Sequence, residues 1–202
     1  MRILVIAPPD DESMFFLPTI AQFKIDTILC LTTGNYDGLG ATRRQELTTV
    51  CQRLGCECRI LDDSRFPDRP KQRWDIDIVA KEMVKALPDV QCLVTFDEYG
   101  VSGHVNHQDT HYASLKAASH WNCEIHCLHS VRNPLRKYMP LLYALSVLFQ
   151  SEQPLSLFRP WWNWTCMATH YSQWVWYRRL FVLFSCYTYW NELRLENRHK
   201  TE

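Results

Sequence analysis

The chain has 202 residues, with 22 Lys and Arg against 22 Asp and Glu, so its formal net charge is zero. This balance excludes the basic field that a nucleic-acid partner needs. No Pro/Gly/Ser-rich linker divides the chain, so we expect residues 1–202 to form a single domain. The nine cysteines are an odd number with no Cys-x-x-Cys pair, which predicts reduced thiols in a protein that faces the cytosol.

The first predicted strand, residues 3–7, ends in an acidic turn before a predicted helix at 13–23. Two prolines break the strand, and Asp10, Asp11 and Glu12 then fall where the first amides of the helix lack partners. N-capping is therefore one interpretation of these carboxylates. A metal or acid–base site is the other, because α/β proteins bind their ligands where strands end. The turn alone leaves both open.

Predicted strands and helices alternate as far as residue 128. Further strands are predicted at 26–32, 57–61, 90–96 and 124–128. Further helices are predicted at 42–54, 75–87 and 107–120. This order predicts an α/β fold, a Rossmann-like three-layer sandwich with a mainly parallel sheet in the order 3-2-1-4-5, so that the first and fourth strands end side by side. No Gly-x-Gly-x-x-Gly follows the first strand, so we expect no nucleotide cofactor.

The fourth predicted strand is followed by a turn that carries two histidines. Gly100 and Gly103 permit tight backbone geometry there, and His104 and His107 can point to one side at the start of a helix. Such a pair is often only polar surface. Beside an acidic turn it favours a ligand site, because carboxylate and imidazole groups from two loops hold catalytic zinc in proteins.

The C-terminal segment, about residues 140–202, is rich in Trp, Tyr and Phe. It contains no run of the ~18–20 uncharged apolar residues that cross a bilayer. Aromatic side chains beside arginines are typical of a membrane interface. A core helix packed on the sheet is the alternative, so the segment is expected either on the domain or at a membrane surface.

Residues 6–16 resemble the His-Pro-Asp-Asp-Glu signature of the zinc-dependent LmbE-like deacetylases. Other segments resemble the eukaryotic branch of that family, the N-acetylglucosaminyl-phosphatidylinositol de-N-acetylases (PIG-L), and the matches run in order from residue 3 to about 187. These segments are Gly34-Asn-Tyr36, Gly40-Ala-Thr-Arg-Arg-Gln-Glu-Leu47, Phe66-Pro-Asp68, Trp74-Asp75, Thr95-Phe-Asp97, Gly100-Val-Ser-Gly-His-Val-Asn-His107, Ser130-Val131, Arg136-Lys-Tyr138, His170-Tyr-Ser-Gln173 and Trp176-Tyr-Arg-Arg-Leu180. The resemblance implies an LmbE-like deacetylase fold.

The resemblance also implies a hydrolytic Zn2+ site. Asp11 and His107 match two zinc ligands of the family. Asp10 matches the general base that takes a proton from zinc-bound water, and His104 matches the histidine that steadies the oxyanion and can protonate the leaving amine. These roles agree with amide chemistry, which needs an activated water and a counter-charge for the tetrahedral intermediate.

Two further residues match supporting positions of the family. Arg43 matches an arginine that contacts the inositol or phosphate part of the substrate. Asp97 fits a carboxylate that supports a histidine from behind, as ligand histidines usually require.

Pro8 stands where the signature has its first zinc-binding histidine, and proline offers a metal no side-chain donor. Three interpretations follow. The chain is a zinc-dependent hydrolase of the N-acetyl group of N-acetylglucosaminyl-phosphatidylinositol, in glycosylphosphatidylinositol-anchor biosynthesis, with weak or rearranged metal binding. Alternatively, it is a catalytically impaired pseudoenzyme that binds the glycolipid or a partner. A single-base sequence variant is the third.

The resemblance implies a glycosylated phosphatidylinositol lipid as partner and the cytosolic face of the endoplasmic reticulum membrane as location. Relatives of this branch usually carry an N-terminal membrane helix, whereas the first residue here is already next to the first strand. We therefore expect peripheral attachment through the aromatic C-terminal segment, or a chain that is not full length.

Overall fold

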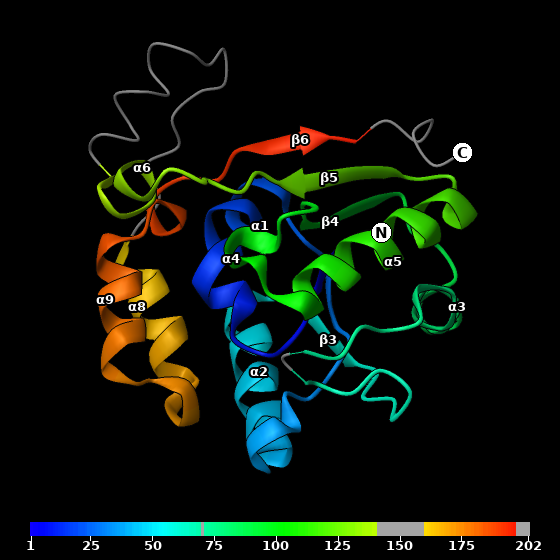
Figure 1. Cartoon of the computed structure of the whole chain (residues 1–202), viewed down its shortest axis with the longest axis horizontal. Coiled ribbons are helices and arrows are strands. Elements are labelled where there is room, and N and C mark those ends of the chain that lie inside the picture. The colour runs from blue at the N-terminus through cyan, green and yellow to red at the C-terminus, as the bar shows by residue number, and fades with distance from the viewer. Residues whose placement is uncertain (70, 141–159, 197–202) are drawn as a thin grey trace.

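Short strands, apolar throughout or alternating apolar with polar residues, form a six-stranded sheet in the order β3-β2-β1-β4-β5-β6. The computed structural model describes residues 1–69, 71–140 and 160–196 (Figure 1). Strands β1 to β5 pair in parallel, and β6 is antiparallel to β5. The strands are β1 (Arg2–Ile6), β2 (Thr27–Cys30), β3 (Glu57–Ile60), β4 (Cys92–Phe96), β5 (Glu124–Leu128) and β6 (Leu193–Leu195). The predicted order of the first five strands is confirmed.

Two helical layers cover the sheet, because successive strand side chains point to opposite faces. Leu4 and Ile6 pack against α1, α2 and α8, whereas Ile3 and Val5 pack against α3 and α5. The helices are α1 (Leu17–Phe23), α2 (Gly40–Leu54), α3 (Ile76–Ala86), α4 (Gly100–Gly103), α5 (Val105–Trp121), α6 (Pro134–Tyr138), α8 (Pro160–Thr169) and α9 (Trp176–Phe184), with short helical turns η1 (Glu12–Phe16), η2 (Asn35–Asp37), η3 (Tyr171–Gln173) and η4 (Cys186–Thr188). The three-layer sandwich is confirmed.

The structure differs from the predicted elements at two helix starts. The helix predicted at 13–23 is divided into η1 and α1, because Pro18 has no amide hydrogen to continue the bonding of the preceding turn. The helix predicted to begin at residue 107 begins at Val105 and follows the short α4. The earlier start places both histidines of the turn at the sheet edge.

The C-terminal segment contributes to the same sheet and core. Strand β6 pairs with β5, and Cys166, Met167, Tyr187 and Trp190 are buried. Residues 141–159 and 197–202, part of the predicted aromatic segment, lie outside the described residues. Among the residues that are described, no helix has the length and apolar character to cross a bilayer.

Candidate functional site

The acidic turn after β1 and the histidine turn after β4 meet at one edge of the sheet. They do so because β1 and β4 are adjacent and parallel, so both strands end on the same side. Asp11 Oδ1 lies 3.3 Å from His107 Nε2, and the rings of His104 and His107 are 4.8 Å apart between centroids. The structure thus brings Asp11, His104 and His107 together.

Asp10 lies on the same turn, buried between two arginines. Its backbone has a φ of 107°, which L residues rarely adopt. Arg43 Nη2, from α2, is 3.2 Å from Asp10 Oδ1, and Arg178 Nη1, from α9, is 2.7 Å from Asp10 Oδ2. Burial raises the pKa of Asp10 to about 6, against the opposite effect of the two guanidinium groups.

His107 is fixed by contacts on three sides. Its Nδ1 donates to the carbonyl of Gly100 at 2.9 Å, since that oxygen can only accept. Its ring stacks on Phe96 with centroids 4.1 Å apart and planes 1° apart. Burial lowers its pKa, but Asp11, the hydrogen bond to Gly100 and Asp10 together raise it more, so the net direction is upward. The remaining Nε2 is therefore presented to Asp11.

His104 lies closer to solvent and carries the opposite pKa shift. Burial, followed by the neighbouring His107, lowers the pKa of its imidazole. Its Nδ1 is buried without a hydrogen-bond partner. The unpaired nitrogen of His104 is therefore available to a ligand in this site.

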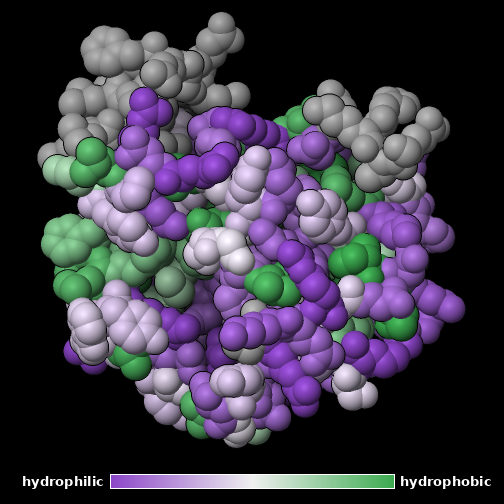
Figure 2. Space-filling model, viewed as in Figure 1, coloured by the Kyte–Doolittle hydropathy of each residue, from purple (hydrophilic) through white to green (hydrophobic). Residues whose placement is uncertain are grey.

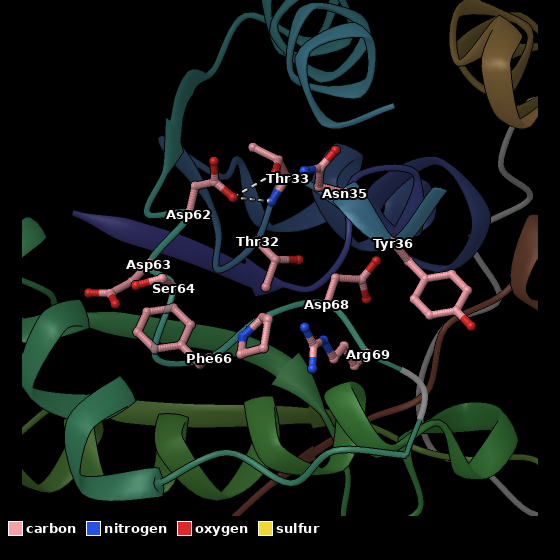
Figure 3. Close-up of a pocket in the computed structure, with 11 residues that line it drawn as sticks. Thr32, Thr33, Asn35, Tyr36, Asp62, Asp63, Ser64, Phe66, Asp68 and Arg69 are labelled. Atoms are coloured by element: carbon pink, nitrogen blue, oxygen red, sulfur yellow. Dashed lines mark hydrogen bonds between the residues drawn. The ribbon is translucent and has the colours of Figure 1, made fainter. Parts of the chain in front are cut away.

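A polar cavity of about 710 Å³ has Asp68 in its wall, and the charge of Asp68 lies near those of Asp11 and His104. Figure 3 shows hydroxyl, amide and carboxylate side chains around it. It is lined by Thr32, Thr33, Asn35, Tyr36, Asp62, Asp63, Ser64, Phe66, Pro67, Asp68 and Arg69. Asp68 Oδ1 accepts from Asn106 Nδ2 at 2.6 Å, which ties the cavity wall to the histidine turn. Such a lining suits a ligand with many hydroxyl groups.

Comparison with known proteins gives the family. A family model described as PIG-L, GlcNAc-PI de-N-acetylase, matches residues 3–118. The chain is also 38% identical to the N-acetylglucosaminyl-phosphatidylinositol de-N-acetylase of Bos taurus, with 95% of this chain and 81% of that protein covered. The chain belongs to the PIG-L family. A probable de-N-acetylase of Dictyostelium discoideum is 32% identical over 95% of this chain and 91% of its own length.

Solved structures of deacetylases share the fold of this PIG-L family member. The N,N'-diacetylchitobiose deacetylase of Pyrococcus horikoshii superposes with a TM-score of 0.64 at 15% identity, over 98% of this chain and 84% of that one. The zinc-inhibited form of teicoplanin deacetylase Orf2 gives 0.58 at 15% identity, over 86% and 85%. The predicted LmbE-like deacetylase fold is confirmed.

Two residues of the PIG-L site are candidate metal ligands. The buried Asp11 Oδ2 has no hydrogen-bond partner, and Asp11 Oδ1 and His107 Nε2 have the spacing of two donors on one zinc ion. Position 8, a histidine in the family signature, is Pro8. Within residues 1–69, 71–140 and 160–196, no three His, Cys, Asp or Glu side chains are arranged to hold a metal. The donors fit zinc through two protein ligands, one fewer than usual.

Asp97 holds the backbone of the histidine turn rather than a ligand imidazole. Its carboxylate accepts from the amides of Gly100, Tyr99 and Ser130. The carbonyl of Gly100 in turn accepts from His107. Asp97 is therefore linked to His107 by hydrogen bonds through the backbone of Gly100 and not by a direct hydrogen bond to that imidazole.

Three groups at this PIG-L site are absent from the sequence-based site. They are Arg178, Asp68 and the buried pair of Glu12 with His170, whose Oε1 and Nε2 are 2.6 Å apart. From the sequence, Glu12 is interpreted either as an N-cap of the following helix or as part of a metal or acid–base site, and neither interpretation involves His170. One signal for these groups was available in the sequence, because segments 66–68, 170–173 and 176–180 resemble the family. That resemblance does not say which side chains contact one another in the folded protein.

Gly100 provides a test of how closely the histidine turn is packed. Its φ is +57°, and an added Cβ would lie 2.7 Å from Cβ of His107. We expect Gly100→Ala to lower the free energy of unfolding by about 1–3 kcal/mol and to weaken zinc binding about 10–100-fold. Urea denaturation and zinc titration measure both effects.

Gly103→Ala is the matched control, because Gly103 lies in the same turn with φ +76° and has nothing within 4 Å of an added Cβ. Equal losses of zinc affinity in the two variants would show that backbone strain, rather than displacement of His107, is responsible.

Proposed function

We propose that this chain hydrolyses the N-acetyl group of N-acetylglucosaminyl-phosphatidylinositol, as the names of its relatives describe for those proteins. The single observation that supports this is the convergence of Asp10 and Asp11 with His104 and His107 at one sheet edge. The reaction adds the oxygen of water to the acetyl carbon and breaks the C–N bond, and it yields acetate and a free amine.

The side chains of the site divide these tasks between them. Asp10 takes the proton of the attacking water as general base. His104 faces the developing oxyanion and delivers a proton to the leaving amine. Asp11 and His107 would hold a zinc ion, which supplies a polarised water and a charge opposite the oxyanion when bound.

The arginines and the cavity would recognise the rest of the substrate. Arg43 and Arg178 place two guanidinium groups beside Asp10, and guanidinium groups bind phosphate oxygens in bidentate geometry. The hydroxyl groups of the sugar and inositol match the polar lining of the neighbouring cavity. We further propose that the protein acts on the cytosolic face of the endoplasmic reticulum membrane, as a peripheral protein.

A second function is favoured by one specific observation, which is Pro8. With two protein ligands in place of three, zinc affinity falls, and the second function is that of a protein of this fold that binds the glycolipid without turning it over. Arg43 and the polar cavity, which would bind the substrate, do not depend on position 8.

The substitution Pro8→His distinguishes the two functions. For a working enzyme, we expect the unaltered chain to release acetate from N-acetylglucosaminyl-phosphatidylinositol with added zinc, and Pro8→His to bind zinc at least about tenfold more tightly. Acetate release and zinc titration are the measurements. Release by Pro8→His alone, with glycolipid binding in both proteins, would assign the second function to the chain as it stands.

A further inference from the structure

Helix α9 turns its apolar side chains away from the protein. Trp176, Tyr177, Leu180, Leu183 and Phe184 recur at helical spacing and are exposed, whereas Val182 faces the core. We call these five exposed side chains the α9 face. Trp176 is 72% and Phe184 is 53% exposed. Figure 2 shows hydrophobic surface over the region of α8 and α9. A helix that serves only the core has the reverse pattern.

The charges around the α9 face have one sign. Residues 130–140 and 160–188, which include α6, α8 and α9, contain no Asp or Glu but five Arg or Lys. Helix α6 lies beside α9, because the rings of Tyr138 and Phe181 are in edge contact at 6.3 Å. Arg136 on α6 and Arg179 on α9 are exposed. Apolar side chains among cations complement a surface with an apolar interior and anionic headgroups.

The same helix reaches the candidate active site. Arg178, between the exposed Tyr177 and Arg179, points inward and lies 2.7 Å from Asp10 Oδ2. It also donates to Gln173 Oε1 at 2.6 Å, which fixes its direction. Helix α9 therefore has an outward apolar side and, on its opposite side, an arginine that contacts Asp10, so one helix separates Asp10 from whatever the outward side contacts.

We propose that the α9 face docks the protein on an anionic lipid bilayer, with the mouth of the active site at the headgroup layer. The proposal deepens the proposed function and rests on it for the identity of the lipid. Trp176 and Tyr177 sit at the interface, Leu180, Leu183 and Phe184 enter the acyl boundary, and Arg136 and Arg179 contact phosphate groups. A membrane-bound glycolipid then reaches Asp10 without leaving the bilayer.

Co-sedimentation with phosphatidylcholine vesicles, with and without phosphatidylinositol, tests the docking. We expect the full chain to bind more strongly when phosphatidylinositol is present. The double variant Trp176→Ser with Phe184→Ser should bind at least about tenfold more weakly. Leu195→Ser, at an exposed apolar residue of β6, is the matched control and should bind as the unaltered chain does.

Three further outcomes would overturn the docking. The first is unchanged vesicle binding in the double variant. The second is a dimer that the double variant converts to monomer on size exclusion, which would assign the face to a second copy of the chain. The third is a fall of several degrees in the unfolding midpoint of the double variant with no loss of vesicle binding, which would show that another part of the chain covers the face.

A water-soluble substrate without lipid tails separates this proposal from the proposed function. Hydrolysis of that substrate should be equal in the unaltered chain and the double variant. Hydrolysis without vesicle binding would refute only the docking, whereas vesicle binding without hydrolysis would refute only the enzymatic function.

Discussion

Replacement of Asp10 by Asn should lower the rate of acetate release by about 10²–10⁴-fold, the usual contribution of a general base. The amide of Asn keeps the shape of the carboxylate but cannot accept the proton of water. Its site is buried between Arg43 and Arg178, so the substrate would still meet both cations. We therefore expect the loss in kcat rather than in KM, measured by steady-state acetate release.

Asp109→Asn is the matched control for Asp10→Asn. Asp109 is also buried and also pairs with an arginine, since its Oδ1 is 2.7 Å from Arg73 Nη1. Both substitutions remove one buried anion from an ion pair, so Asp109→Asn shows how much of a change in kcat comes from altered folding. If Asp109→Asn reduced kcat as much as Asp10→Asn, the effect would come from weakened folding, and Asp10 would lose its assignment as base.

Glu12→Gln should lower the free energy of unfolding by about 3 kcal/mol near pH 6. Glu12 and His170 are fully buried and 2.6 Å apart, and removal of one member of such a pair costs about 3–5 kcal/mol. The lower value applies because His170 can lose its proton when its partner is gone. Urea denaturation of both proteins gives the difference.

The pH dependence of that difference identifies its origin. Burial raises the pKa of Glu12, but the pairing with His170 lowers it, and the net shift from 4.5 is downward. The stabilisation that Glu12 contributes to the folded state is therefore lost as pH falls. Burial lowers the pKa of His170, but the pairing with Glu12 raises it, and the net shift from 6.5 is upward. The stabilisation that His170 contributes to the folded state is therefore lost as pH rises through the raised pKa. The difference should be largest between pH 4.5 and 6.5, and a difference independent of pH would exclude the charged pair.

Arg194→Ala, which breaks the exposed pair with Glu192, should change stability by under about 1 kcal/mol.

The sheet could be predicted from the sequence because each of its parallel strands has a local pattern, which is an apolar run in β1, β2 and β4 and an alternation of polar and apolar residues in β3 and β5. Residues 124–128 and 57–61 were predicted almost to the residue. Strand β6 could not be predicted in this way. It has three residues, and its pairing with β5 depends on the position of the whole C-terminal segment rather than on local pattern.

The meeting of the two turns could also be predicted, because strand order alone places the ends of β1 and β4 together. The partners of Asp10 could not. Arg178 is far from Asp10 in the sequence, and its approach depends on how α9 packs. The same holds for His170, which is buried against Glu12 through a contact between distant residues. Long-range contacts between charged side chains leave no periodic signal in a single sequence.

The account depends on one cation shared by the two turns, and zinc titration of the purified chain tests this most directly. We predict one equivalent of zinc bound by the unaltered chain, and its loss in Asp11→Asn and in His107→Ala separately. Ser102→Ala, at an exposed position of the same turn, should leave binding unchanged. Zinc that remains bound in either of the first two variants, or that does not bind to the unaltered chain at all, would contradict the account.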